Sequence, residues 1–196
     1  MITNFKIFKN KNSKTILIVD IQPGHKNYIS FDIYDFVEYL NKNKEKNILY
    51  LFNGTELGYD SEYDIKNWLI KYGLDDDIYI EFYEKTYGFF RDLIDTGIDD
   101  KYIIELGKYM IYNSLYSLND IPDNYKLEFY KNNNIDLNEY SFFTIPYDIK
   151  EFLEDNIYKN EILELLGGGK DECLLEIKLL LNMMNINYNE NYDFIY

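Results

Sequence analysis

One short segment near the start of the chain constrains the fold more than any other feature. Residues 15–20 read Thr-Ile-Leu-Ile-Val-Asp, an apolar run with no polar residue at alternate positions, and Gln22-Pro23-Gly24 breaks it soon afterwards. A strand that is apolar on both faces has to be covered on both faces, as in a parallel sheet between two layers of helices. The run therefore predicts an interior strand of an α/β protein, with Asp20 at its carboxyl end.

The same alternation of strands and helices continues along the chain. Helices are indicated by apolar residues three and four positions apart, and strands by short apolar runs between turn residues such as Asn, Gly and Asp. In order, the predicted segments are a helix at 32–40, a strand at 47–52, a helix capped by Ser61 and ended by Gly73, a strand at 78–82, a strand at 161–166, a helix at 170–184 and a strand at 192–196. This order predicts a three-layer α-β-α, Rossmann-like fold with a mainly parallel sheet of five or six strands.

The middle of the chain has a different character. Residues 98–160 contain helical stretches, such as 103–112 and 148–153, separated by turns rich in Asn and Asp, and they contain no convincing buried strand. No linker rich in Pro, Gly or Ser borders them. We therefore expect a single domain over residues 1–196, with 98–160 as a helical insertion.

The charge balance argues against some partners. With 20 Lys and Arg against 35 Asp and Glu, the formal net charge is −15, which opposes non-specific binding to nucleic acids and to anionic lipids. No apolar run approaches the roughly 20 residues that cross a bilayer, and no signal-peptide pattern precedes the first strand. We expect no nucleic-acid partner, no membrane partner and a cytoplasmic location.

The aromatic content is explained first by the base composition of the genome and only second by a function. The chain has 22 Tyr and 13 Phe but no Ala, and residues with AT-rich codons are abundant throughout. We expect these rings mainly to fill the hydrophobic core and only secondarily to form a stacking surface for a ligand. Such codon content suits a phage, another virus or a small-genome bacterium, and in the viral case the location would be the host cytoplasm.

The rare residues limit the chemistry. One Cys and one His exclude a disulfide framework, a Cys/His zinc cluster and any scheme that needs two histidines, so no metal and no cofactor is expected. Cys173 falls in the first turn of the helix predicted after the glycines at 167–169, where the positive end of a helix favours a thiolate. Asp171 and Glu172 oppose that charge, so a buried Cys that acts as a small apolar side chain stays an alternative.

Two other kinds of site have weaker support. The glycines before Lys170 lack the G-x-x-x-x-G-K-[ST] spacing of a phosphate-binding loop, and the acidic residues after it would repel a phosphate. A metal-dependent α/β nuclease needs several carboxylates around Mg²⁺. The candidate ligands are Asp20, Glu56, Asp60, Asp92 and Asp171. A lysine within such a cluster, and the negative field of the whole chain, argue against that function.

Three residues far apart in the sequence resemble a known catalytic set. Asp20-Ile21-Gln22 is similar to an Asp-x-Gln element, and Lys85 stands in the run Glu-Lys-Thr-Tyr-Gly-Phe-Phe at 84–90. The run Gly-Gly-Gly-Lys-Asp-Glu-Cys-Leu at 167–174 matches a G-x-x-T-D-x-C-V motif at its first Gly, its Asp and Cys173. Their order, and their places after the first, third and fourth strands, resemble the Asp-Lys-Cys triad of the isochorismatase-like cysteine hydrolases.

The resemblance covers about residues 15–96 and 160–196, and it departs from the family in several places. Gly88 and Lys170 stand where the family has Ser and Thr. Some members bind zinc through Asp and His residues after the second strand, but residues 53–64 contain no His. A zinc site of that type is therefore not expected.

The resemblance implies a role for each residue of the set. Asp20 would take the proton of the Cys173 thiol and deliver it to a leaving nitrogen or oxygen, while Lys85 would stabilise the thiolate. Backbone N–H groups of the loop at Gly168 and Gly169, together with that of Cys173, would hold the developing oxyanion. The residues expected to line the pocket are Gln22, Tyr87 and Phe89.

Two functions of different classes therefore stay open beside the nuclease. The first is a cysteine hydrolase that cleaves a C–N bond in a small neutral or cationic amide-like substrate, with His25 expected either at the border of the pocket or in a solvated loop. The second is a catalytically silent protein that keeps this fold as an interaction or assembly module of a phage or other virus. The acidic neighbours of Cys173 favour the second, whose partner would be a protein, and the aromatic residues leave a homo-oligomer open.

Overall fold

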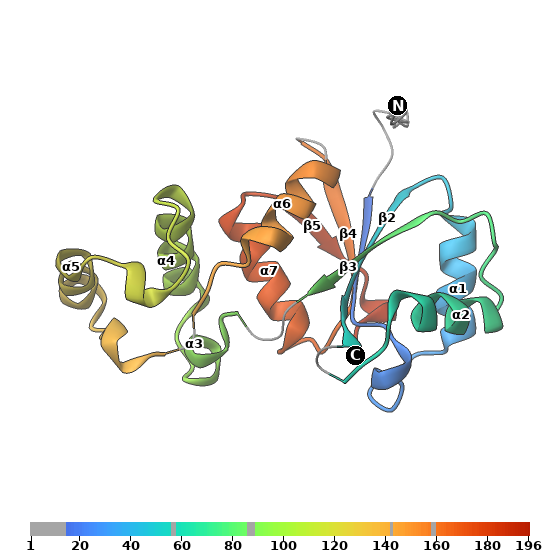
Figure 1. Ribbon diagram of the computed structural model, residues 1–196, viewed down its shortest axis with the longest axis horizontal. Helices are drawn as coiled ribbons and strands as arrows, with labels where there is room; N and C mark the ends of the chain where they lie inside the picture. Colours follow the sequence, from blue (N-terminus) through green and yellow to red (C-terminus); the bar gives the residue numbers. More distant parts are fainter. Residues whose placement is uncertain (1–14, 56–57, 86–88, 142, 158–159) are drawn as a thin grey trace.

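The computed structural model describes residues 15–55, 58–85, 89–141, 143–157 and 160–196, and it shows an α/β protein built on a parallel sheet (Figure 1). The sheet has five strands in the order β3-β2-β1-β4-β5, and every pair of neighbours is parallel. The strands are β1 (Thr15–Val19), β2 (Asn47–Asn53), β3 (Ile80–Lys85), β4 (Ile162–Gly167) and β5 (Asn187–Glu190). The predicted fold class is confirmed.

The apolar run at 15–19 is buried on both faces, as its composition requires. All five residues of β1 are buried, with Ile16 and Ile18 in one hydrophobic core and Leu17 and Val19 in the other. Helices cover both faces of the sheet (Figure 1). They are α1 (Ile33–Lys42) and α2 (Glu62–Lys71) on one face, and α6 (Tyr147–Asn156) and α7 (Cys173–Met183) on the other. The three layers therefore follow from a strand that is buried at every position and apolar from Ile16 to Val19.

The strand order reverses direction at β1. The chain moves outward from β1 to β2 and β3, then returns past β1 to β4 and β5. In such sheets the two halves diverge at the carboxyl ends of the strands where the order reverses, which leaves a crevice there. Asp20 follows β1 and the glycine loop at 167–169 follows β4, so both lie at this point.

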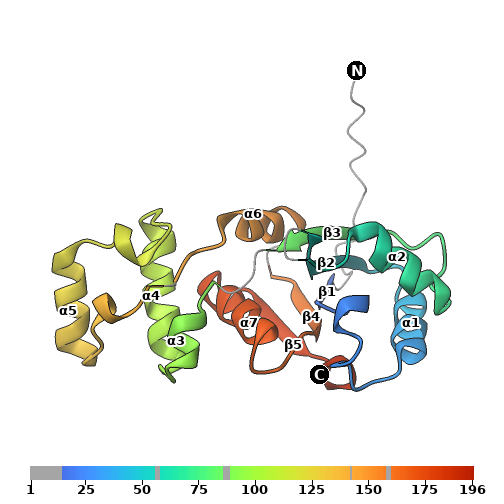
Figure 2. The ribbon, with the colours of Figure 1, turned by 60° about the horizontal axis from the view of Figure 1, so that its bottom comes forward.

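The segment predicted as a helical insertion has two parts. Its helices α4 (Asp100–Tyr112) and α5 (Asp123–Asn133), with the short α3 (Arg91–Asp95) before them, form a lobe beside the sheet, whereas α6 lies over the sheet (Figure 2). The lobe is joined to the sheet layer through α4 and α7. A Cβ at Gly107 of α4 would lie 2.3 Å from the Sδ atom of Met183, so the two helices approach closely. One continuous core therefore runs through the sheet layer and the lobe.

Local signals placed most elements well, placed the third strand with shifted bounds and failed at the last strand. Ser61 caps α2 with a full capping box to Asp64, as expected. The third strand runs to Lys85 rather than ending at 82, so Lys85 is its last residue. The final strand predicted at 192–196 is wrong: β5 lies at Asn187–Glu190, and Tyr192–Phe194 form a 3-10 turn. Phe194 buries its ring against α1 instead, which explains the misleading apolar signal.

None of the helices in the described ranges is long and apolar enough to cross a membrane.

Because the central sheet is buried on both faces, substitutions in β4 should affect the free energy of unfolding very differently at buried and exposed positions. Replacing Leu165, which is 0% exposed, with Ala should lower the free energy of unfolding by about 3 kcal/mol, since it leaves a cavity in the core. Replacing Ile162 of the same strand, which is 47% exposed, with Ala should lower the free energy of unfolding by less than about 1 kcal/mol. Urea unfolding followed by circular dichroism measures both, and equal losses would contradict the placement of β4.

Candidate functional site

The structure brings Asp20, Lys85 and Cys173 together at the carboxyl edge of the sheet. Lys85 Nζ lies 2.9 Å from Asp20 Oδ2, and both side chains are buried, at 2% and 0% exposure. The Cys173 thiol, at the first residue of α7, is close enough for the charges of both to act on it. Three elements that are distant in the sequence therefore meet at the point where the strand order reverses.

Lys85 reaches Asp20 across the end of the strand between them. β2 separates β3 from β1, and Asn53 at the end of β2 is the register partner of Lys85. Lys85 Nζ donates a hydrogen bond of 2.9 Å to Asn53 Oδ1, in addition to its ion pair with Asp20. The long lysine side chain thus spans the neighbouring strand, and Asn53 satisfies a second of its three donors.

The backbone at Asp20 helps to place its carboxylate. Asp20 has a left-handed backbone with φ of 54°, a conformation that Asp and Asn adopt more readily than most residues. Its N–H donates to the carbonyl of Leu51, and its own carbonyl accepts a bond of 3.0 Å from the Tyr196 hydroxyl. Besides the ion pair with Lys85 and a contact with the Cys173 thiol, the buried carboxylate has no further hydrogen-bond donor among the described residues.

The glycine loop requires its glycines for steric reasons. Gly167 and Gly168 have positive φ values of 81° and 67°. A Cβ at Gly167 would lie 2.1 Å from the carbonyl oxygen of Val19, and one at Gly168 would lie 3.0 Å from the backbone N of Leu174. Both positions therefore need glycine, which lets the loop pass close to β1 and turn into α7.

The loop also presents backbone donors near the thiol. The backbone hydrogen bonds found among the described residues of this loop use the N–H of Lys170, Glu172 and Leu174, but not those of Gly169 and Cys173. Unpaired N–H groups at the start of a helix stabilise negative charge. The expected oxyanion-holding groups are thus available, although that role stays a prediction.

The electrostatics of the thiol oppose the thiolate that the start of a helix would favour. Burial and the negative charge of Asp20 raise the pKa of Cys173 to about 12, against the lowering effect of Lys85. For Lys85, burial alone would lower the pKa, but the neighbouring acidic groups, Asp20 first, reverse that effect and raise it. The resting site therefore holds a protonated thiol and a charged ammonium, with Asp20 placed to receive the thiol proton.

The residues expected to line the pocket have other places. Gln22 is fully buried and ties β1 to β2, since its Nε2 donates to the Asn53 carbonyl and its Oε1 accepts from the Asn53 N–H, each at 3.0 Å. Phe89 is 2% exposed and packs edge to face on Phe90 in the core. Tyr87 lies outside the described residues. Gln22 and Phe89 are therefore buried, and neither is among the described residues that line the cavity at Cys173.

His25 borders the cavity, and its contacts indicate its tautomer. Because Lys85 can only donate, Asn53 turns its Oδ1 toward Lys85 and its Nδ2 toward His25. The Nδ2 of Asn53 lies 3.4 Å from Nε2 of His25, so that ring nitrogen accepts and the proton of a neutral ring sits on Nδ1. The tautomer of His25 is therefore coupled to the position of the ammonium group.

Glu176 is a buried acid that the sequence analysis missed. It lies one turn after Cys173 on α7, is only 3% exposed, and its Oε1 accepts a hydrogen bond of 3.0 Å from the N–H of Phe90. Burial raises its pKa. The carboxylate anchors the chain that follows β3 to the helix that carries the thiol. Its spacing from Cys173 along the inward face of the helix was the available signal.

A cavity of about 410 Å³ opens above the thiol. Its size suits a small molecule. It is lined by His25, Tyr28, Tyr59, Gly169, Glu172, Cys173 and Tyr196. The Tyr196 hydroxyl bonds to the Asp20 carbonyl, so the buried ion pair lies beneath this cavity.

Among the described residues, the carboxylates proposed for a nuclease do not gather around a common point. Within the described ranges, no group of three or more His, Cys, Asp or Glu side chains is placed to hold a metal ion. Asp60 accepts hydrogen bonds from Gln22 and the Gly24 N–H, and Asp92 accepts from Ser141. Glu56 lies outside the described residues. The observed geometry gives the nuclease hypothesis no support.

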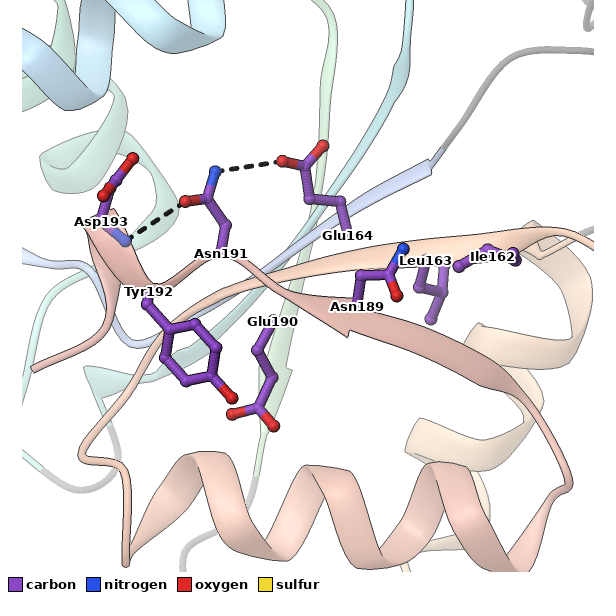
Figure 3. Close-up of a pocket in the computed structure, with 8 residues that line it drawn as sticks. All are labelled: Ile162, Leu163, Glu164, Asn189, Glu190, Asn191, Tyr192 and Asp193. Atoms are coloured by element: carbon purple, nitrogen blue, oxygen red, sulfur yellow. Dashed lines mark hydrogen bonds between the residues drawn. The ribbon is translucent and has the colours of Figure 1, made fainter.

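A second hollow lies along the edge of the sheet, between β4 and β5 (Figure 3). It measures about 340 Å³, and its polar side chains bond to one another and to lysines. Asn191 donates to Glu164, which also pairs with Lys46, and Glu190 pairs with Lys178 at 3.0 Å. Glu164 and Glu190 are therefore engaged in holding the edge of the sheet, and the lone thiol of the chain is elsewhere.

No protein-family model, curated protein or solved structure matches the chain. The parallel sheet is compatible with a Rossmann-like fold, which hosts many different chemistries. The function therefore has to be argued from the side chains at the site.

The raised pKa of the thiol predicts slow alkylation of the resting protein. At pH 8, Cys173 should react with iodoacetamide about 10³-fold more slowly than a free cysteine, and the rate should keep rising above pH 10, because only the thiolate reacts. Asp20→Asn should lower the pKa and speed the reaction at least about 10-fold, since it removes a negative charge next to the thiol while Lys85 stays.

Asp171→Asn serves as the matched control for this prediction. It removes the same charge from an exposed position two residues before the thiol, so it should change the rate less than about twofold. The rate is read by mass spectrometry of the single cysteine. An unchanged rate in Asp20→Asn would contradict the arrangement of the three residues.

Proposed function

We propose that the protein is a cysteine hydrolase that cleaves a C–N bond in a small amide-like substrate, with Cys173 as the nucleophile. The observation that carries the proposal is the buried contact of 2.9 Å between Lys85 Nζ and Asp20 Oδ2, with the thiol beside both and facing a cavity. The order and places of the three residues, which resemble the isochorismatase-like hydrolases, support the same chemistry.

The first half of the reaction transfers the thiol proton. Because the resting pKa of Cys173 is raised, the proton leaves only as sulfur attacks the carbonyl carbon of the bound amide, and Asp20 accepts it. The carbonyl π electrons move onto oxygen, which forms a tetrahedral oxyanion. When the C–N bond breaks, the oxyanion re-forms the carbonyl, and Asp20 returns the proton to the departing nitrogen, leaving an amine and a thioester on Cys173.

The second half of the reaction restores the enzyme. A water molecule attacks the thioester while Asp20 accepts one of its protons, and a second tetrahedral oxyanion forms. Its collapse breaks the C–S bond and releases the carboxylic acid. The sulfur takes the proton back from Asp20, so atoms and charge balance over the cycle.

Lys85 and the backbone N–H groups of the loop stabilise negative charge and transfer no proton. Lys85 offsets the negative charge that moves between sulfur and Asp20, and Asn53 holds its ammonium group in place. The N–H groups of Gly169 and Cys173 stabilise the oxyanion, where the loss of one donor typically costs about 10²–10³ in rate. Glu176 acts as a positioning residue, because it holds the chain after Lys85 against α7.

One observation favours the other candidate function, a catalytically silent interaction module. A thiol with a pKa of about 12 is inert in the absence of a substrate that promotes proton transfer. A catalytically silent interaction module would keep the same inert thiol indefinitely. The two functions therefore differ in what happens when an acyl donor enters the cavity.

The test is acyl-enzyme formation with p-nitrophenyl acetate, followed by turnover of a panel of small primary amides and ureides measured by ammonia release. We expect a burst of p-nitrophenolate and a mass increase of one acetyl group on Cys173, with neither in Cys173→Ala. Asp20→Asn should lose amide turnover by at least about 10²-fold although its thiol alkylates faster, because the proton acceptor is gone.

The Asp171→Asn control should keep wild-type rates in both assays. A thiol that alkylates yet forms no acetyl-enzyme, with no amide of the panel cleaved, would overturn the hydrolase in favour of the silent module. Parallel loss of alkylation and turnover in Asp20→Asn would show a misfolded site, which circular dichroism of the same variant detects.

A further inference from the structure

The wall of the cavity above Cys173 has an unusual composition for so small a space. Of the seven described residues that line it, four carry aromatic rings, one is a carboxylate, and none is a lysine or an arginine. The rings belong to His25, Tyr28, Tyr59 and Tyr196. The acid is Glu172, directly before the nucleophile. Aromatic faces and a carboxylate together attract cations and repel anions.

The rings pack partly on one another, and two of the tyrosines keep a large exposed area. His25 and Tyr59 stack with their centroids 4.9 Å apart, and Tyr28 lies 6.3 Å from His25 in a tilted orientation. Tyr28 is 71% exposed and Tyr59 40%, so neither ring is used up as core volume. Tyr196 is held from below by its hydroxyl bond to Asp20. A ligand that enters the cavity therefore meets uncovered ring surface.

The charges around the cavity favour the same sign of ligand. Glu172 forms no side-chain cap on α7, and none of the ion pairs between described residues includes it. Arg91, whose charge interacts with Glu172 through space, is paired with Asp95 at 3.0 Å. Lys85 is paired with Asp20 at 2.9 Å, so its charge is offset within the buried site. The free carboxylate is thus not balanced inside the cavity.

We propose that this wall is a binding subsite for an ammonium group, formed by the faces of Tyr28 and Tyr59 and the carboxylate of Glu172. Combined with the proposed hydrolase, on which this part rests, it assigns the substrate as a small amide whose far end carries a protonated or methylated amine. The subsite itself is a property of the cavity and exists whether or not Cys173 is catalytic.

The lone cysteine allows the subsite to be tested without any turnover. Methanethiosulfonate reagents that carry a trimethylammonium, a neutral methyl or a sulfonate group modify the same sulfur, so their relative rates report the charge preference of the cavity. Each rate is divided by the rate of the same reagent with free 2-mercaptoethanol, which removes intrinsic reactivity. Thiolate availability cancels in the ratio, because all three reagents need the same thiolate.

We expect the normalised rate of the trimethylammonium reagent to exceed that of the sulfonate reagent at least about 10-fold. Glu172→Gln and Tyr59→Leu should each reduce this ratio about threefold or more, with the neutral reagent changed little. Glu172 makes no cap hydrogen bond, so its replacement leaves the start of α7 intact. The matched controls are Glu139→Gln and Tyr112→Leu, exposed on the helical lobe, which should leave the ratio unchanged.

Tetramethylammonium chloride supplies a second readout. It should slow modification of Cys173 by the neutral reagent in the wild type, relative to the same concentration of sodium chloride, and should do so less in Tyr59→Leu. Equal normalised rates for the cationic and anionic reagents, or equal protection by the two salts, would overturn the subsite.

The substrate assignment has its own test. The matched amides are N-acetyl-1,4-diaminobutane, the neutral N-pentylacetamide and the anionic 4-acetamidobutanoate, and the first should be cleaved at least about 10-fold more efficiently than the others. A charge preference without cleavage of any amide would leave the subsite standing and overturn the hydrolase. Cleavage of the amides with no preference for the cationic one would leave the hydrolase standing and overturn the subsite.

Discussion

The buried ion pair between Asp20 and Lys85 is the interaction on which the rest of the site depends. Removing two charges from water costs several kcal/mol per ion, and attraction offsets that cost only where the geometry is good and other donors are satisfied. Asn53 meets this condition with a second bond to Lys85, and the left-handed backbone at Asp20 lets its carboxylate turn inward at the end of β1. The glycine loop then brings the thiol to the same point.

One ammonium group beside two acidic groups explains the state of the thiol. Lys85 can neutralise either the carboxylate of Asp20 or a thiolate at Cys173, but not both at once in a buried space. The pKa of Cys173 is raised, so the sulfur keeps its proton at rest. In the proposed hydrolase, the carboxylate of Asp20 beside the thiol gives that proton a destination, so the site responds to a substrate rather than being permanently reactive. The proposed ammonium subsite in the cavity lined by tyrosines and Glu172 would then select which substrates bind.

The accuracy of the sequence predictions followed the range of the interactions involved. β1 and the capped start of α2 were predictable because a two-sided apolar run and a Ser-to-Asp capping box are local signals. The strand predicted at 192–196 failed because the burial of Phe194 depends on α1, which lies far away in the sequence. Glu176 was missed for a related reason: its bond to Phe90 joins two segments that only the folded chain brings together.

The sequence by itself determined a parallel α/β sheet, the placement of an acid, a lysine and a cysteine at or just after strand ends, and a glycine turn before the cysteine. These follow from hydrophobic pattern and from backbone conformations that only glycine adopts freely. Only the tertiary structure decided that the three side chains meet, that the thiol is protonated and that tyrosines surround it. Those properties depend on burial and on distances between charges, and neither quantity exists until strands and helices from separate parts of the chain are packed against each other.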